Sequence, residues 1–182
     1  MKQTNPQAAI RYSRRRRRSK GAELVEFTLN FLPFMVMIIA IVDTSWAIFA
    51  QSTLQQAVRM AVRTGVTMTT AQVSTNLTDT VKALVQQHAV GLLNGSTKLQ
   101  YIKVNYFDSA NPSNDVSNKS WGNNSGNIMQ VSVRNYPLSP LMARFFNWNS
   151  APDASPMSIN VYAADVIEPM SQSVTPPIGP AP

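Results

Sequence analysis

Residues 27–50 of the chain read FTLNFLPFMVMIIAIVDTSWAIFA, and eighteen of these twenty-four residues are apolar. Asp43 is the only charged residue among them. As an α-helix this segment would be roughly 36 Å long, enough to cross a hydrocarbon core of about 30 Å. Helices in the cores of soluble proteins are rarely apolar on every side over such a length, so the pattern favours a transmembrane helix.

The charge on the N-terminal side of this span is strongly positive. Eight of the sixteen Lys and Arg residues lie within the first twenty positions, and no Asp or Glu precedes Glu23. The rest of the chain has eight basic and nine acidic residues, so the net charge of +7 comes from the N-terminal segment. A broadly basic nucleic-acid-binding domain is therefore excluded, and we expect no nucleic-acid partner. The absence of Cys excludes disulfides, thiol catalysis and Cys-ligated metal sites.

Basic residues next to a span predict its orientation in the membrane. Those that precede this span include Arg14, Arg15, Arg16, Arg17, Arg18 and Lys20. Only Arg59 and Arg63 follow it closely. The positive-inside rule then places the N-terminus in the cytoplasm and the C-terminal part across the membrane, with the basic leader in contact with anionic lipid. A secretory signal peptide is the competing interpretation, but its apolar region would be shorter, about 7 to 15 residues.

The sequence KGAELVEF, residues 20–27, joins the basic leader to the span. Gly21 is followed by Ala22, and Glu26 stands five positions after the glycine. This arrangement resembles the processing site of type IV prepilins and pseudopilins, which a membrane aspartyl peptidase cuts after the glycine on the cytoplasmic side. The resemblance implies cleavage between Gly21 and Ala22, with Glu26 as the fifth residue of the mature chain.

A longer stretch narrows the family. Residues 20–65 resemble TadE-like minor pilins, which are pseudopilins of the tight-adherence type IV pilus system, in a Val-Glu-Phe motif, a proline within the span and a juxtamembrane helix with repeated Ala and Arg. The matching residues are Val25, Glu26, Phe27, Leu32, Pro33, Ala57, Arg59, Ala61, Arg63 and Gly65.

The family resemblance also implies a location and a set of partners. It implies a single-pass subunit of the bacterial inner membrane, with its C-terminal domain in the periplasm, that can enter an extracellular pilus and act in its assembly, in surface adhesion or in secretion. The implied partners are the prepilin peptidase, major and minor pilins, the inner-membrane assembly platform and membrane lipid. The alternative is a membrane-anchored envelope binding module, an adhesin or sensor, that is not assembled into a filament.

Two residues of the membrane segment have expected roles. A carboxylate at the membrane edge is disfavoured unless it has a partner. The family resemblance implies that Glu26 pairs with the new amine of Ala22 in a neighbouring subunit, and the alternative is a carboxylate solvated among the headgroups. Pro33 removes one helical hydrogen bond, which predicts a kink or a loosened turn.

The rest of the chain predicts a small exported domain, so the fold class is α+β and pilin-like. Helical periodicity favours one helix from about Glu23 to Thr64, with Gly65 as its stop. A second, amphipathic helix is expected over residues 76–93, ended by Asn94 and Gly95. Apolar residues alternate over 102–106, 129–133 and 157–163, which predicts a three-stranded antiparallel sheet packed on that helix.

The expected organisation is a leader over 1–21, the long helix over 22–65, the exported domain over 66–168 and a Pro-rich, extended tail over 169–182. Residues 105–127 are rich in Asn and Ser and are expected to be an exposed loop. Phe145, Phe146 and Trp148 are expected to cover the core or, if exposed, to form a subunit interface.

Enzyme chemistry is not expected from this sequence. His88 is the only histidine, and it falls on or beside the apolar stripe of the second helix, as a core or boundary residue would. Asp108 and Asp115 lack the spacing of a calcium loop. The sequence has no phosphate-binding glycine loop, nucleophile elbow or paired histidines. We therefore predict a structural protein with no cofactor and no metal.

Overall fold

The computed structural model describes residues 7–73, 75–138, 157–169 and 175–179, and the side chains of residues 7–20 lie outside what it describes. Phe145, Phe146 and Trp148 lie outside the described residues as well. The chain divides into two compact units, Met1–Thr44 and Ser45–Pro182.

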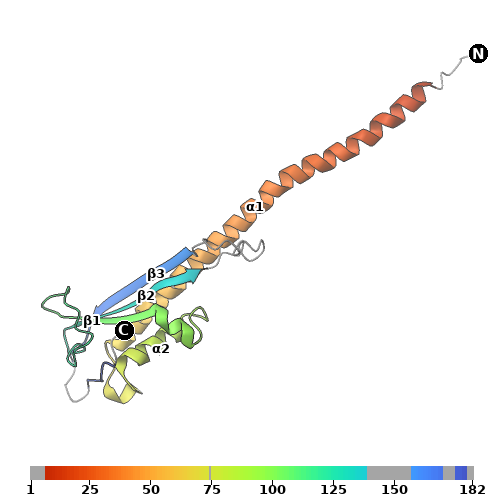
Figure 1. The fold of residues 1–182 in the computed structure, drawn as a ribbon. Coiled ribbons are helices and arrows are strands. Elements are labelled where there is room, and N and C mark those ends of the chain that lie inside the picture. Colours follow the sequence, from red (N-terminus) through yellow and green to blue (C-terminus); the bar gives the residue numbers. More distant parts are fainter. Residues whose placement is uncertain (1–6, 74, 139–156, 170–174, 180–182) are drawn as a thin grey trace, which may run out of the picture. The chain divides into compact units, whose positions relative to one another are not determined.

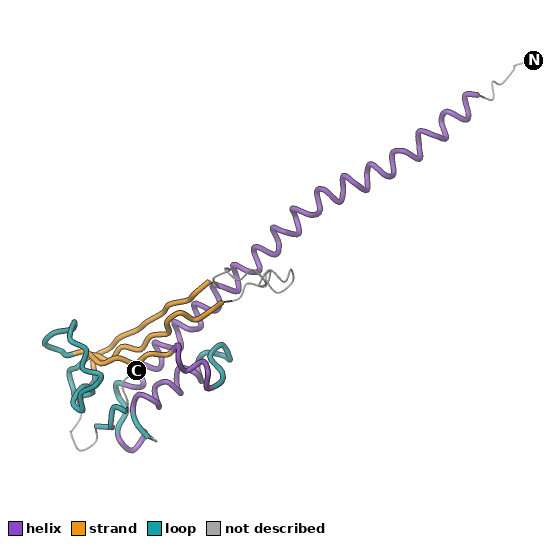
Figure 2. Tube along the Cα trace, viewed as in Figure 1, coloured by secondary structure: helices purple, strands orange, loops and turns teal. Residues whose placement is uncertain are grey.

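The first unit consists of the N-terminal part of helix α1, which spans Gln7–Gly65 (Figures 1 and 2). The helix therefore begins well before Glu23, where the sequence led us to expect its start. Residues 7–20 are dominated by Arg, Ala, Gln and Lys, which favour helix, and they contain neither Gly nor Pro. Pro33 lies inside α1, and the expected kink there stays a prediction.

The second unit is an α+β domain, as predicted. It contains the end of α1, helix α2 (Leu77–His88) and three strands, β1 (Ile102–Phe107), β2 (Ile128–Leu138) and β3 (Met157–Val166). Two short 3₁₀ helices, Thr70–Gln72 and Ser96–Tyr101, lie in the connections. The strands form one antiparallel sheet in the order β1-β2-β3 (Figures 1 and 2).

Strand β2 is longer than its alternating pattern predicted. Its register against β3 shifts between Val133 and Tyr136, and Asn135 within this irregularity has a φ of 54°. Beyond the shift, Tyr136 and Leu138 return to the core. A bulge adds a residue to one strand and so interrupts the period of two, which hid the second half of the strand from the sequence pattern.

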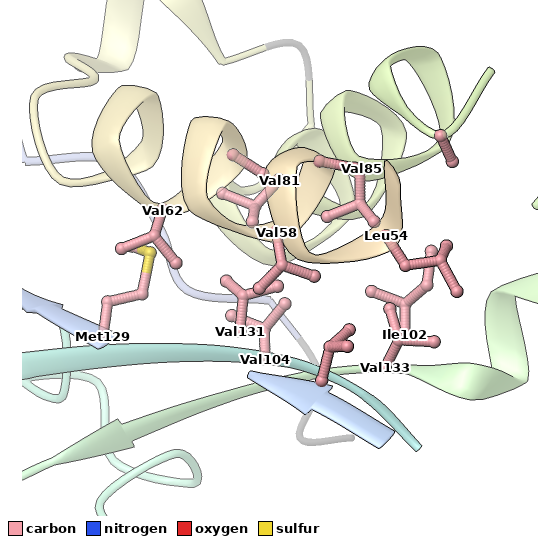
Figure 3. Packing of buried hydrophobic residues seen from close by; sticks show 14 of the residues in the cluster. Leu54, Val58, Val62, Val81, Val85, Ile102, Val104, Met129, Val131 and Val133 are labelled. Atoms are coloured by element: carbon pink, nitrogen blue, oxygen red, sulfur yellow. The ribbon is translucent and has the colours of Figure 1, made fainter. Parts of the chain in front are cut away.

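The core lies between the sheet and a layer made of α2 and the end of α1. Figure 3 shows Leu54, Val58 and Val62 of α1 facing the inner side of the sheet. In the same layer, Val81 and Val85 of α2 face this side of the sheet as well. The apolar side chains that α1 buries are those of Ala50, Leu54, Ala57, Val58, Ala61 and Val62. The core of this unit therefore draws on α1 as well as on residues after position 65.

Gly65 ends α1, as predicted, but for a different reason. Its φ is not in the left-handed region that a glycine helix cap usually adopts. A Cβ atom on Gly65 would lie 2.8 Å from a methyl carbon of Val81 and 3.1 Å from the sulfur of Met129. Glycine is thus favoured at this position, because the side chains of Val81 in α2 and Met129 in β2 lie close to the backbone of α1.

Helix α2 ends earlier than the sequence suggested. It stops at His88, whereas Asn94 and Gly95 were expected to end it. Val90 and Gly91 adopt φ values of 48° and 84°, which no α-helical residue has, so the helix cannot continue through them. His88 is exposed rather than in the core or at its boundary, because Ala89 is the residue buried at this end of α2.

Two segments, the loop expected to be exposed and the tail expected to be extended, contribute to the core. Within the Asn-rich loop, Val116, Ser117, Asn123 and Asn127 are buried. In the C-terminal tail, Ile178 is buried, and the backbone N–H groups of Leu77 and Thr78 donate to the carbonyls of Pro177 and Ile178. The first N–H groups of a helix have no partner within it, so residues 175–179 satisfy the N-terminus of α2.

Candidate functional site

The apolar part of α1 that follows Gly21 has the side chains expected of a membrane-spanning helix. Among the described residues, α1 is the one helix long and apolar enough to cross a membrane, and its most apolar stretch is not buried. Large apolar residues are exposed all around it. They include Leu24, Val25, Phe27, Leu29, Phe31, Leu32, Phe34, Val36, Met37, Ile38, Ile41 and Val42. Such a surface is suited to lipid or to other apolar helices, because water would solvate it poorly.

The hydroxyl groups of this segment are satisfied within the helix. Thr28 Oγ1 donates to the carbonyl of Leu24 and Thr44 Oγ1 to that of Ala40, both at 2.8 Å. Hydroxyls bonded to the preceding turn need no water, so both threonines are compatible with a hydrocarbon environment.

The residues of the expected processing site lie in the same helix. Gly21, Ala22 and Glu26 are all exposed, and a Cβ on Gly21 would have no atom within 4 Å. Ala22 and Glu26 are four positions apart, so they lie on one face about 6 Å apart along the axis. Glu26 has no hydrogen bond or ion pair to any described residue. Arg14, Arg15, Arg16, Arg17, Arg18 and Lys20 lie in α1, with their side chains outside the description.

The face that carries Glu26 continues as a stripe of mostly polar and small residues. The spacing of a helix places Asn30, Pro33, Met37, Ala40 and Thr44 in line with it. Phe31, Ile38 and Val42 lie on the other side of the helix. The sequence analysis gave Asn30 no role. Its spacing of four residues from Glu26 nevertheless predicts that the two residues lie on one face of the helix.

The second unit places the two loop carboxylates in local turns. Asp108 Oδ1 accepts from the backbone N–H of Ala110, while Asp115 Oδ1 accepts from the hydroxyl of Ser117 at 2.5 Å and from its backbone N–H at 2.9 Å. Burial raises the pKa of Asp115, but the bonds from Ser117 and Asn105 outweigh it and leave this pKa below its usual value. Within the described ranges, no group of three or more His, Asp or Glu residues could hold a metal ion.

A surface pocket in this unit lacks the residues of a catalytic site. The pocket is lined by Ser117, Asn118, Lys119, Ser120, Pro177, Ile178 and Gly179. Lys119 is the only charged residue among these lining residues, and a single exposed ammonium defines no catalytic site. The N-terminal apolar helix is therefore the segment with a distinct functional character.

The described residues define a class of protein: an α+β domain preceded by an N-terminal apolar helix, which is consistent with a single-pass membrane anchor. The model of the family described as TadE-like protein matches residues 21–63, about a quarter of the chain. This match confirms the resemblance to TadE-like proteins of the tight-adherence pilus system. No curated protein matches the sequence, and no solved structure matches the fold.

Proposed function

We propose that this chain is a minor pilin-like structural subunit of a tight-adherence pilus, cut after Gly21 by a prepilin peptidase. The observation that supports this most strongly is where the family match begins. The TadE-like match begins at Gly21, the glycine of the processing motif, and covers the exposed apolar part of α1. The known character of the family is structural and pilus-associated, which agrees with a subunit rather than an enzyme.

The environment of Gly21 suits recognition by a peptidase. No described side chain covers the glycine, so the peptide bond between Gly21 and Ala22 is open to another protein. A helical peptide bond must unwind locally before a protease can cut it, and glycine lowers the free energy that this costs by about 1 kcal/mol relative to alanine. The basic leader before it would remain in the cytoplasm, beside the anionic headgroups.

After cleavage, Glu26 would have a partner in a neighbouring subunit. The new α-amine of Ala22 lies on the same face of α1, one helical turn before Glu26. A neighbouring parallel helix that is shifted by one turn brings its amine to the level of this carboxylate. The pair removes two separate charges from the apolar environment, where each alone would be strongly disfavoured, and its formation sets the shift between adjacent helices.

The proposed orientation in the membrane is consistent with the assembly platform and the other pilins as partners. In this proposal residues 27–50 span the inner membrane, the leader faces the cytoplasm and the α+β domain that follows the span lies in the periplasm. The pilus assembly platform would then extract the mature chain from the lipid and add it to major and minor pilins. Contacts made by the periplasmic domain would act in adhesion or secretion.

N-terminal sequencing of the chain purified from the membrane of its own cells tests the proposal. We expect the mature chain to begin at Ala22, and a strain without prepilin peptidase to yield the full-length form. A chain that begins at Met1 in both strains would contradict the proposal and favour an anchored binding module. A chain that begins downstream of the span would also contradict it, and would indicate a cleaved secretory signal peptide.

A further inference from the structure

Asn30 differs from the other uncharged polar residues of the membrane segment. Thr28 and Thr44 donate to carbonyls of the preceding turn, whereas the side chain of Asn30 makes no hydrogen bond within the described part of the chain. A primary amide has two N–H donors and an acceptor, and leaving them unpaired in hydrocarbon is unfavourable. In a membrane, Asn30 therefore needs a partner from another helix.

The position of Asn30 indicates which partner this is. Ala22, Glu26 and Asn30 are spaced by four residues each, so the three lie on one face at intervals of about 6 Å. If an identical parallel helix is shifted by one turn, its Ala22 lies opposite Glu26 and its Glu26 lies opposite Asn30. A single shift thus places an amine beside one carboxylate and an amide beside the next.

We propose that Asn30 is an assembly residue that donates a hydrogen bond to Glu26 of a second copy of this chain, within the membrane. This inference rests on the proposed function, because it requires the span and the amine formed by cleavage. Each Glu26 inside a row of copies would accept from the Ala22 amine of one neighbour and from the Asn30 amide of the other. A second copy fits because the groups of this one chain complement one another at that shift.

The rest of the same face permits two helices to approach closely. Pro33, Met37, Ala40 and Thr44 lie in line with Asn30. Ala40 and Thr44 are small and Met37 is a flexible side chain, so the face has no large branched or aromatic residue to hold a second helix away. The opposite side of the helix carries Phe31, Ile38 and Val42, which hold neighbouring backbones further apart. An unshifted pair is disfavoured because it would place two Glu26 carboxylates against each other.

The chain has no Cys, so cysteine cross-linking reports the shift directly. Two differently tagged full-length copies are expressed with a prepilin peptidase in a host without other pilins, and disulfides are formed in isolated membranes. We expect the pair A40C with T44C to cross-link more strongly than A40C with A40C, because a one-turn shift brings residue 40 opposite residue 44. The pair A40C with V42C is the control, since residue 42 lies on the other side of the helix.

Asn30→Leu introduced into both copies tests the residue itself. Membrane hydrogen bonds typically change association about 3-fold to 30-fold, so we expect a loss of cross-linking of that order. Thr28→Val removes a hydroxyl that is already satisfied, and it should leave the yield unchanged. Asn30→Gln keeps the amide and should restore part of the yield.

The outcomes separate this inference from the proposed function. Unchanged cross-linking in Asn30→Leu, or preferred cross-linking of A40C with A40C, would overturn the role of Asn30 while cleavage after Gly21 and membrane insertion still held. Absence of the A40C–T44C cross-link between the two copies, with cleavage and insertion intact, would show that the partner of Asn30 is not a second copy. A chain that alkaline carbonate extracts from the membrane, or that is not cut after Gly21, would instead refute the proposed function.

Discussion

The hydroxyl of Thr78, in the first turn of α2, donates a hydrogen bond to the carbonyl oxygen of Ile178 at 2.5 Å. The same hydroxyl lies 3.5 Å from the phenol oxygen of Tyr106, which is fully buried on β1. The C-terminal segment, α2 and the sheet thus meet at one buried threonine. Residues 175–179 therefore contribute to the domain's core, so a stable fragment of the domain must include them.

We predict that a fragment of residues 45–182 folds cooperatively, whereas a fragment of residues 66–182 does not. The shorter fragment lacks all six core residues of α1, among them Leu54, Val58 and Val62. Deleting one buried leucine typically costs 2–5 kcal/mol, so the combined loss exceeds the stability of a small domain, which is about 5–15 kcal/mol. Circular dichroism and thermal melting distinguish the two fragments. A sharp melting transition in the shorter one would show that α1 is dispensable to the core.

Tyr106 should make the domain sensitive to alkali. Burial raises the pKa of Tyr106 to about 12, and the hydrogen bond with Thr78 offsets this only in part. The unfolded chain ionises its tyrosine near pH 10 while the folded chain keeps Tyr106 protonated, so folding stability falls as the pH rises from 10 towards 12. Urea unfolding of the 45–182 fragment should show this loss, at up to about 1.4 kcal/mol per pH unit. Tyr106→Phe should flatten this dependence, and an equally steep dependence in that variant would assign the loss to other groups.

Gly65→Ala should destabilise the same fragment by about 1–3 kcal/mol. The added methyl group would lie 2.8 Å from Val81 and 3.1 Å from Met129, so the helix and the sheet must move apart. Thr64→Ala is the control, because Thr64 is exposed on the adjacent position of α1 and should change stability by less than about 0.5 kcal/mol. Equal unfolding free energies for both variants, from urea titration, would mean that the close approach does not restrict residue 65.

Gly21→Leu should block maturation in cells that contain the peptidase. A Cβ at Gly21 would meet no other atom of the described residues within 4 Å, so we expect the substitution to leave the fold intact and to act on recognition by the peptidase. The expected result is accumulation of the longer form in the membrane, seen by electrophoresis and N-terminal sequencing. Ala22→Ser, on the other side of the bond, changes little in size and serves as the control. Normal maturation of Gly21→Leu would refute cleavage at this bond.

Glu26→Ala should be cut normally but assemble poorly. Its carboxylate acts after cleavage in our proposal, so the mature form should still begin at Ala22 while pili or surface attachment decrease at least tenfold, as expected when one partner of a desolvated charge pair is removed. Glu23→Ala, three residues earlier on the same helix, is the matched control and should assemble as the wild type does. Wild-type levels of pili in Glu26→Ala would mean that Glu26 is only solvated by the headgroups.

The sequence alone was sufficient for the features that depend on local composition. A long, mostly apolar run is visible without any tertiary contact, so the span and the resemblance around Gly21 and Glu26 could be recognised directly. The three strands were predicted because one face of the sheet is buried, which imposes an alternation of period two. The predicted end of α2 was wrong because Val90 and Gly91 adopt positive φ values, which the amphipathic pattern does not reveal.

Contacts between distant segments were decided only by the tertiary structure. The pattern of α1 predicts an apolar stripe with Leu54, Val58 and Val62. It does not predict that this stripe packs against the sheet in a shared core. Likewise, the Pro-rich composition of the tail predicts extended chain, and only the fold shows Ile178 bonded to the N-terminus of α2. Composition and periodicity determine which face of a segment avoids water, whereas which partner covers that face depends on how all the segments pack together.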